Sequence, residues 1–439
     1  MKRNLKQILL VFLALAITVS ASTCLFSCGR ESTAQTTGET IPGIMSSDNS
    51  TSGTVDATGG TTTGTVQEPI DGTTTGTTTP IVTPPVNDGD YINPLTGLKT
   101  NNKDASTLKP LAVIVDNVDA AYAHQTGLTQ ADILYETLVA PGITRFTALI
   151  SDYSALKDIC NIREAYMEHI DIVGSHNAVL VAHGGATHLG DFVSVAAARF
   201  GGGWNENLQK NTYGYINTMK DIAFTAEGGE RYGTIKYYKD DESYRKDIGF
   251  DTLLTSSAVA AIFSTKASAF VQSGATEKGS AKAFTFVDLT ETKVMNGTAA
   301  KEIKISFTMD NYAGTKSVAY VYDTELGMYL RYQGTSNKAH KDSVTGAQLA
   351  FTNVLTLFTD VTSTKTANDE VVTSTMVVGE GTGYYFYGGE AVEIKWSKSA
   401  WDGALTLTDK DGNALELARG TTYVSYLDNT NTAKAVSFS

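Results

Sequence analysis

The stretch DILYETLVAPGITRFTALI, Asp132 to Ile150, is the part of this sequence that says most about the fold. Its two flanks are rich in Ile, Leu, Tyr, Thr, Val and Phe, which are the residue types that favour paired strands. Pro141 and Gly142 stand between the flanks and indicate a two-residue turn. The pattern therefore predicts a β-hairpin that packs against a core.

Two charged residues, Glu136 and Arg145, interrupt the apolar flanks of this hairpin. If Pro141-Gly142 forms the turn, Leu138 faces Arg145, and Glu136 lies diagonally from Arg145 on the same face. Diagonal neighbours are about 7–8 Å apart, within reach of long side chains. One interpretation is a structural ion pair at the rim of a sheet, worth about 0–1 kcal/mol when exposed. The other is a functional pair partly withdrawn from water, where burial of each charge is costly.

The first 28 residues predict export and lipidation. Three basic residues precede an apolar run, residues 8–20, that is shorter than the roughly 20 residues needed to span a bilayer. The following LFSCG resembles the lipobox of bacterial lipoproteins, in which the cysteine is acylated. We therefore predict a signal peptide over residues 1–27 and a lipid on Cys28; an ordinary cleaved signal is the alternative.

Residues 28–88 predict a disordered tether. They are rich in Thr, Gly and Ser and almost lack large apolar side chains, so they cannot bury enough surface to offset the entropy of ordering. About 60 flexible residues span roughly 40 Å root-mean-square. Such a tether would hold a folded head away from the membrane.

Charge and cysteine content exclude several classes of protein. The formal net charge of −13 becomes −16 when the three basic residues of the signal are removed. So acidic a chain is poorly suited to bind nucleic acid or anionic lipid by electrostatics. Cys24 lies in the predicted signal and Cys28 carries the predicted lipid, so Cys160 is left without a disulfide partner. Cys160 is then either a small buried side chain or a reactive thiol.

The rest of the chain divides into two halves, and the fold class that we predict is α+β. Residues 89–270 mix short apolar strands such as LAVIVD (111–116) with helical spacing over residues 162–173, which predicts a layered mixed α/β N-terminal head domain. Residues 271–439 contain nine strand patterns separated by turn signals, which predicts a mostly antiparallel β C-terminal domain. The many Tyr and Phe residues on these strands indicate either a packed sheet face or a platform for stacking glycans.

The segment HGGATH contains a second candidate site. A strand over residues 178–185 runs into Gly184-Gly185, and a glycine turn before a helix exposes N–H groups that suit an anion. His183 would lie at the carboxyl end of that strand, where open α/β sheets bind ligands. Together with Arg145 and Arg163 this turn could bind a carboxylate or a phosphate, although a surface role for Arg163 is equally compatible with the sequence.

Other motifs of known chemistry are missing from the sequence. Four histidines, His169, His176, His183 and His188, fall within 20 residues, but a zinc site needs three or four that converge. The sequence has no phosphate-loop, nucleophile-elbow or H-E-x-x-H pattern. We therefore predict no metal site and no cofactor.

With these motifs in view, the chain resembles the YerB-like lipoproteins, an uncharacterised family of Gram-positive envelope proteins. The resemblance rests on NPLTGL (93–98), QTGLTQADILYETLVAPGITRF (125–146), HKDSVTGAQLAFTNV (340–354) and the later segments GTGYYFYGGEAVEIKWSKS and RGTTYVSYL. It covers most of residues 91–427, in two family domains. It implies an extracytoplasmic lipoprotein with a layered α/β first domain, and it implies no activity.

The resemblance also implies which polar residues are family features. These are Asp132, Glu136, Arg145, Arg163, His183, Gly184 and Gly185. The chain departs from the family pattern where a second Arg is expected three residues after Arg163, since Tyr166 stands there. An Asn-Asn pair is replaced by Asp116-Asn117, and a Pro-His-Asn run is missing near residues 245–256. These departures weaken any anion-binding or acid–base role that relied on the replaced residues.

Our leading hypothesis is a protein anchored by lipid on the extracytoplasmic face of the cell membrane. It would bind a cell-wall polymer or an envelope protein without turnover. The alternative is a wall-active hydrolase or transferase in which Asp132 or Glu136 is the general acid or base and His183 transfers protons. Arg145 and Arg163 would then hold an anionic group. A spacer without any ligand site is a third possibility.

Overall fold

A computed structural model of the chain describes a large part of the region that follows the predicted tether. The predicted signal peptide, almost all of the tether, and His183, Gly184 and Gly185 lie outside the described residues, as does the predicted domain boundary at residues 270–271. The described residues are 82, 84–119, 121–152, 156–182, 235–236, 253–254, 284–309, 312–334, 338–366 and 369–439.

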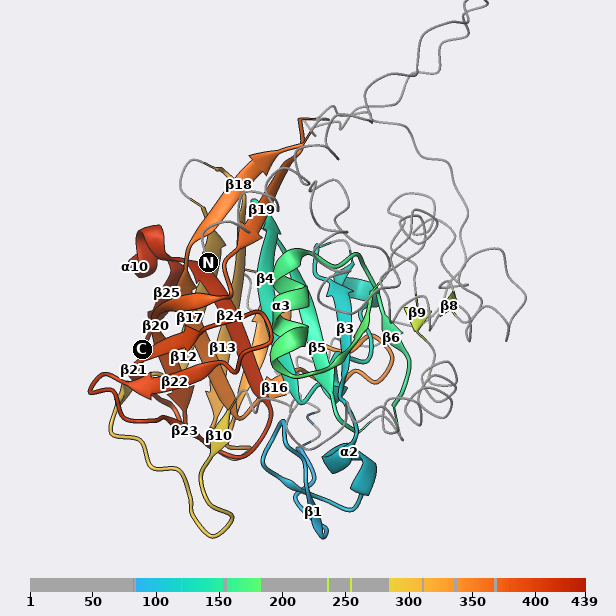
Figure 1. Cartoon of the computed structure of the whole chain (residues 1–439), viewed down its shortest axis with the longest axis vertical. Coiled ribbons are helices and arrows are strands. Elements are labelled where there is room, and N and C mark those ends of the chain that lie inside the picture. The colour runs from blue at the N-terminus through green and yellow to red at the C-terminus, as the bar shows by residue number, and fades with distance from the viewer. Residues whose placement is uncertain are drawn as a thin grey trace, which may run out of the picture. The chain divides into compact units, whose positions relative to one another are not determined.

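The described part of the chain is largely β, and its centre is a ten-stranded mixed sheet (Figure 1). Strands from both halves of the sequence share this sheet. The strand β24 lies parallel to both β17 and β4, and so joins the late strands to the early hairpin. The order across the sheet is β11 (Thr298–Ala299), β21 (Glu390–Lys398), β20 (Gly379–Tyr387), β17 (Asn353–Thr359), β24 (Thr422–Asp428), β4 (Ile133–Ala140), β5 (Ile143–Ile150), β3 (Leu111–Asp116) and β7 (Val179–Val181), with β22 (Thr406–Asp409) on β21.

A second sheet covers one face of the central sheet, and the helix α3 (Met167–Ser175) packs on the other face. The second sheet is antiparallel. Its order is β15 (Lys338–Ala339), β14 (Met328–Gln333), β13 (Thr315–Asp323), β12 (Glu302–Thr308) and β25 (Val436–Phe438), with β16 (Ala350–Phe351) also on β14.

Small sheets and short helices complete the described structure. The small sheets are β1 (Tyr91–Ile92) with β2 (Lys99–Thr100), β10 (Thr285–Phe286) with β23 (Glu416–Leu417), β18 (Val361–Lys365) with β19 (Val371–Thr375), and β6 (Ile159–Cys160) and β8 (Ile235–Lys236) on either side of β9 (Leu253–Leu254). The helices are α2 (Lys103–Thr107), η1 (Tyr122–His124), η2 (Leu128–Gln130), η4 (Asn429–Asn431) and α10 (Thr432–Ala435). Among the residues listed above as described, no helix is long and apolar enough to cross a bilayer.

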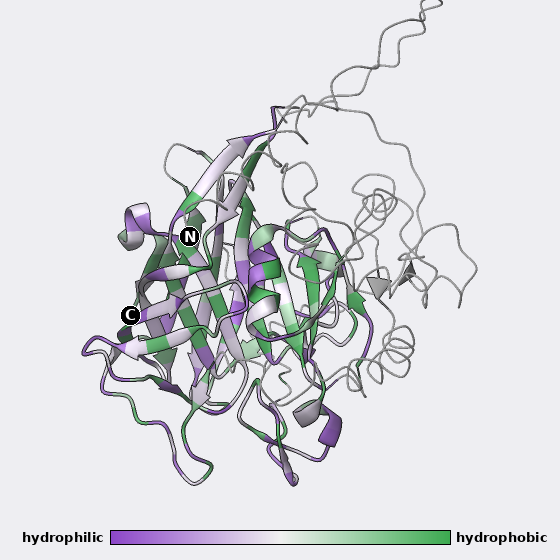
Figure 2. Ribbon diagram, in the orientation of Figure 1, coloured by the Kyte–Doolittle hydropathy of each residue, from purple (hydrophilic) through white to green (hydrophobic). Residues whose placement is uncertain are grey.

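The apolar runs of β3, β4 and β5 follow from burial on both faces of the sheet (Figure 2). On β4, Leu134 and Leu138 face the second sheet, whereas Tyr135 and Val139 face the α3 side. Successive strand residues point to opposite faces, so a strand with two buried faces needs apolar residues at nearly every position. This requirement explains why the opening stretch does not alternate between apolar and polar residues.

The predicted hairpin is present, but its predicted register is wrong. The structure pairs Arg145 with Thr137 and Glu136 with Phe146, and an irregularity in the ladder follows Leu138. This bulge adds one residue to β4, and a shift of one residue reverses the face on which each side chain lies. Glu136 and Arg145 therefore project from opposite faces of the sheet and do not pair.

The strands predicted for the second half are confirmed: each of the nine patterns contains a strand, from β12 to β24. The aromatic residues on these strands are mostly core residues, since Tyr320, Tyr385, Tyr423 and Tyr426 are at most 1% exposed. This burial favours the packed sheet face over the glycan platform.

The α/β layering predicted for the first half is not clear in the described residues. The helix predicted from residue 162 begins only at Met167, because Ile162 bridges to Val115 and the backbone N–H of Arg163 donates to Ile114 O. The helix predicted to follow Gly184-Gly185 lies outside the described part. The described chain is therefore classed as largely β, with mixed and antiparallel sheets.

The turn between β4 and β5 provides a test of how tightly the two halves pack. Gly142 has φ +72°, and a Cβ there would lie 2.7 Å from backbone atoms of Gly314 and Thr315, just before β13. Gly327 has a similar φ of +66° with nothing within 4 Å. We expect Gly327→Ala to cost about 1–2 kcal/mol from the left-handed backbone alone. Gly142→Ala should cost at least about 1 kcal/mol more, because packed backbone would have to move. Urea unfolding of both variants measures the difference, and equal losses would contradict the close approach.

Candidate functional site

The acid of the opening hairpin, Glu136, lies in a sealed polar network between the two sheets. Arg331 Nη2 on β14 is 2.5 Å from Glu136 Oε2, and Tyr423 Oη on β24 donates to the same oxygen at 2.7 Å. Asn117 Nδ2 and Thr144 Oγ1 donate to Oε1 at 2.8 Å and 2.7 Å. All five residues are buried, and Glu136 and Arg331 have no exposed surface. We call Asn117, Glu136, Thr144, Arg331 and Tyr423 the interior network.

Neighbouring polar groups extend the interior network beyond Arg331. Arg331 Nε donates to Tyr320 Oη at 3.0 Å, and Nη1 lies 3.0 Å from His340 Nδ1. His340 Nε2 lies 2.7 Å from Gln125 Oε1. Burial, followed by the charge of Arg331, lowers the pKa of His340 well below its ordinary value. A neutral His340 can then accept from Arg331 at Nδ1 and donate to Gln125 from Nε2.

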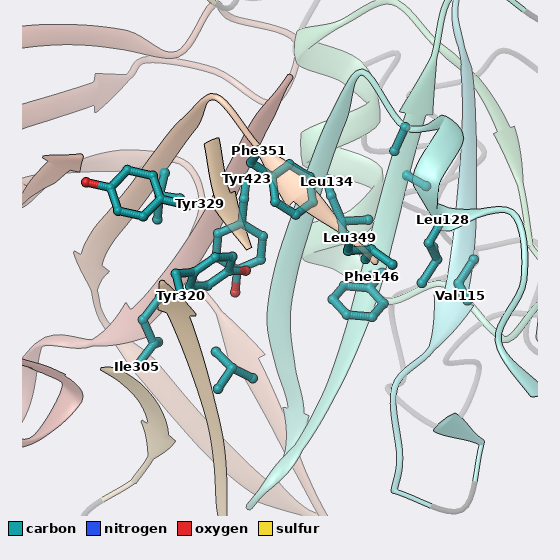
Figure 3. Packing of buried hydrophobic residues seen from close by; sticks show 14 of the residues in the cluster. Val115, Leu128, Leu134, Phe146, Ile305, Tyr320, Tyr329, Leu349, Phe351 and Tyr423 are labelled. Atoms are coloured by element: carbon teal, nitrogen blue, oxygen red, sulfur yellow. The ribbon is translucent and has the colours of Figure 1, made fainter. Parts of the chain in front are cut away.

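Aromatic rings surround the guanidinium of Arg331. Figure 3 shows these rings, Phe146, Tyr320 and Tyr423, within the buried core. Its Cζ lies 5.2 Å from the ring centre of Phe146, 5.8 Å from that of Tyr320 and 5.6 Å from that of Tyr423. Burial alone would lower the pKa of Arg331, but Tyr320, Glu136 and Tyr423 outweigh burial and raise it. The guanidinium therefore stays charged, and its attraction to the rings adds to the ion pair.

The geometry of the interior network indicates a structural role for Glu136. Its two oxygens accept four hydrogen bonds, and no surface of the side chain reaches solvent. A general acid or base must lie within hydrogen-bond reach of a substrate, and this carboxylate is enclosed. The sequence hypothesis missed Arg331, 195 residues away from Glu136. The sequence does contain a signal for Arg331. This residue interrupts the apolar strand MYLRYQ, just as Glu136 interrupts the apolar strand ILYETLVA.

The base of the hairpin, Arg145, belongs to a different group on the α3 side of the sheet. Its Nη2 is 2.8 Å from Glu164 Oε1, and its Nη1 donates to the backbone oxygen of Glu164 at 2.8 Å. Arg163 Nε lies 3.4 Å from both Glu164 Oε2 and Asp116 Oδ2. We call Asp116, Arg145, Arg163 and Glu164 the arginine cluster. Glu164 bridges its two guanidinium groups.

The local fold brings the arginine cluster together at the carboxyl end of β3. Asp116 ends β3 and is the register partner of Arg145 on β5. The segment with Arg163 and Glu164 crosses the end of β3 just before α3, and the ring of Tyr166 lies 5.0 Å from Arg145 Cζ. Thus Arg145 and Arg163 both contact Glu164, which is one of the arrangements that the sequence left open, whereas Glu136 does not join them.

The arginine cluster is only partly closed to solvent. The side chains of Arg163 and Glu164 are 27% and 26% exposed, whereas Asp116 is 1% exposed. Burial raises the pKa of Asp116 despite the charges of Arg163 and Arg145. Burial also raises the pKa of the Glu164 carboxyl, but the charges of Arg145 and Arg163 outweigh burial, so this pKa is lowered. The pKa of Asp116 is therefore shifted upward and that of Glu164 downward within the same cluster.

Several buried polar atoms near Arg145 lack a hydrogen-bond partner within the described residues. They are Arg145 Nε, Thr147 Oγ1 and Glu168 Oε1, and Asp116 Oδ2 has only the 3.4 Å ion pair with Arg163 Nε. Burial raises the pKa of Glu168 to about 8, so this acid is largely protonated at neutral pH. Buried polar groups in proteins are nearly always paired, and a concentration of unpaired ones calls for an explanation. A water, an ion or a ligand group at this place would supply the missing bonds.

The remaining predicted residues lie apart from both groups. Asp132, at the start of β4, accepts from Ser151 N at 2.6 Å, from Ser151 Oγ at 2.7 Å and from Asn93 Nδ2 at 2.9 Å. It lines a separate cleft of about 850 Å³. His169 and His176 are buried on the α3 side and bond different residues, Thr137 and Tyr135. Within the described part of the chain, no three His, Cys, Asp or Glu side chains are placed to hold a metal ion.

We predict that the ion pair of the interior network is coupled energetically. Removing one partner of a buried pair leaves an uncompensated charge, so Arg331→Met should destabilise the fold by about 3–5 kcal/mol. In a background with Glu136→Gln, the same substitution should cost much less, because no carboxylate remains to be paired. Urea unfolding of the double-mutant cycle measures the coupling. Additive losses would show that the two charges do not interact.

We also predict that Glu168 makes stability depend on pH. Its pKa is about 8 in the fold and 4.5 as a free side chain, so the folded state retains a proton that the unfolded chain loses. Stability should therefore fall as the pH rises towards and through 8. Between pH 6.5 and 9, Glu168→Gln should remove roughly 2 kcal/mol of this fall. Urea unfolding at both pH values tests this, with the exposed Glu380→Gln as the control. An unchanged pH profile in Glu168→Gln would contradict the assignment.

Comparisons with known proteins agree with this architecture. The N-terminal domain of a protein family of unknown function, DUF3048, matches residues 95–221, and the C-terminal domain of the same family matches residues 307–424. The Putative lipoprotein YerB of Bacillus subtilis (strain 168) is 35% identical over 91 residues, which are 21% of this chain and 27% of that protein. The match thus spans about a quarter of that relative.

A solved structure has the same fold. The crystal structure of the YerB protein from Bacillus subtilis superposes with a TM-score of 0.54 at 19% identity, covering 80% of this chain and 100% of that one. Two family domains in the expected order, a related sequence and a shared fold lead to one conclusion: this chain belongs to the YerB-like, DUF3048 family.

Proposed function

We propose that this protein is anchored by lipid on the outer face of the cell membrane and binds an envelope component there without turnover. The lipobox at Cys28 and the long tether support the anchor, and a relative carries the name of a putative lipoprotein. The bound component is a cell-wall polymer or an envelope protein. It presents an anionic group, a carboxylate or a phosphate, to the arginine cluster.

The observation that carries this proposal is the incomplete hydrogen bonding around Arg145. Arg145 Nε is a buried donor that lacks a hydrogen-bond partner among the described residues, and it lies next to the partly exposed Arg163. Guanidinium groups bind carboxylates and phosphates through short, charge-assisted hydrogen bonds. The carboxylate of Glu164 already occupies the space between the two arginines, which indicates the kind of group that fits there.

The charge of the arginine cluster sets the pH dependence of this binding. Two guanidinium groups face the carboxyls of Glu164 and Asp116, and Glu168 is largely neutral at pH 7 because its pKa is about 8. Burial raises the pKa of Asp116, so as the pH falls its carboxyl takes up a proton at a higher pH than a free aspartate does. The cluster then loses a negative charge, so its affinity for an anion rises. Binding should therefore strengthen several-fold as the pH is lowered from 7.5 towards 4.

A binding assay with the full-length protein in detergent tests the proposal. Purified wall fragments are pelleted with wild type, with Arg163→Gln, and with Lys304→Gln as a control, since Lys304 is 61% exposed on the second sheet. Arg163→Gln should weaken binding by about 10–100-fold, because hydrogen bonds to charged groups contribute about 1.5–3 kcal/mol. The control should bind like wild type.

Two outcomes of this assay would overturn the proposal. Equal binding by Arg163→Gln and wild type would show that the arginine cluster takes no part. Release of soluble wall products during the incubation would instead favour the hydrolase or transferase. In that case Asp132→Asn tests the general acid, since Asp132, unlike Glu136, lines a cleft.

A further inference from the structure

A cleft at the start of the folded head is separate from the arginine cluster and has no role in the function proposed above. Its volume is about 850 Å³, which is within the range of roughly 300–1,000 Å³ found for small-molecule sites. Residues from both family domains line it, among them Gln130 and Asp132 from the first and Ala350 and Thr421 from the second. The site exists only when the two parts are assembled.

The charges of this cleft favour a cation. Asp132 and Asp152 line it, whereas the one basic side chain among its lining residues is Lys99. Burial is the main cause that raises the pKa of Asp132, and the charge of Asp152 adds to it. The two carboxylates therefore repel each other, and Asp152 also accepts a hydrogen bond from Asn102 Nδ2 at 2.8 Å. A positive group bound near both would remove this repulsion, whereas an anion would increase it.

The uncharged polar groups of the cleft favour a peptide. Thr100, Asn101 and Thr129 line it and are at least partly exposed. Their amide and hydroxyl groups can donate to and accept from the backbone of a peptide. Apolar surface is also present, since Pro84 and Val86 form one wall.

The exposure of Val86 points to an occupant for the cleft. Its side chain is 74% exposed although it belongs to the wall of a concave site. A ligand in the cleft would cover this valine, which lies at the end of the predicted tether. We propose that the cleft is a second binding site, which takes a short peptide segment carrying a primary ammonium group. The ammonium group lies between Asp132 and Asp152, and the peptide backbone lies along the amide and hydroxyl groups.

The probe for this site is Ac-Ala-Lys-Ala-NH2, in which the side-chain ammonium is the single charge. Its partner probe has an acetylated lysine and no charge. The full-length protein in detergent is titrated with each probe by calorimetry. The charged peptide should bind at least tenfold more tightly than the neutral one. Asp152→Asn should reduce the affinity for the charged peptide at least fivefold, and Glu393→Gln, an exposed change of the same charge on β21, should leave it unchanged.

Each result decides for or against the second site. Equal affinity for the two peptides, or no binding of either, would overturn it. Unchanged binding by Asp152→Asn would place the ammonium group elsewhere and also overturn it. A second variant, Asp132→Asn, should weaken binding as well, and its thermal unfolding shows whether the fold is retained. Arg163→Gln should not affect the peptide, so failure here is distinct from failure of the wall-binding assay.

Discussion

The buried ion pair between Glu136 and Arg331 is the constraint on which the rest of the structure depends. Moving two charges out of water costs several kcal/mol per ion, and their attraction offsets this cost only when the remaining hydrogen bonds are satisfied. Here Tyr423, Asn117 and Thr144 satisfy the carboxylate. These donors come from β24, β5 and the segment after β3, so the pair is stable only when all of these elements are in place. The early hairpin and the later sheet are thereby held in one arrangement.

The bulge in β4 separates this structural charge from the others. One additional residue before the turn places Glu136 against the second sheet and Arg145 against the α3 side. The face of the central sheet that the second sheet covers then holds an ion pair with no exposed surface. The α3 face holds arginines that solvent can reach. The question raised by one acid and one base in an apolar hairpin thus has two answers. The acid serves the packing of two sheets, and the base belongs to a partly open polar site.

The two open sites differ in their electrostatics for a physical reason. The arginine cluster lies at the carboxyl end of β3, where guanidinium groups outnumber ionised carboxyls once Asp116 is protonated. The cleft lies at the start of the head, where carboxylates outnumber ammonium groups. A strongly acidic protein repels polyanions in general, so a local positive site is needed to hold an anionic group.

Local patterns in the sequence determined much of this protein. Residue type and turn signals predicted the hairpin and all nine later strands, because strand propensity and hydrophobic pattern depend on near neighbours. The sequence also offered Arg145 in the hairpin and Arg163 before a helix as parts of one anion pocket, and the structure places both against Glu164, while a ligand there stays a prediction. Only the tertiary structure decided the register of β4, since a bulge depends on how both faces are covered. It also decided the partner of Glu136, because a carboxylate within a strand carries no information about which of many distant arginines will reach it. Burial, and with it the raised pKa values of Asp116 and Glu168, arises only when the sheets and the helix close around these groups.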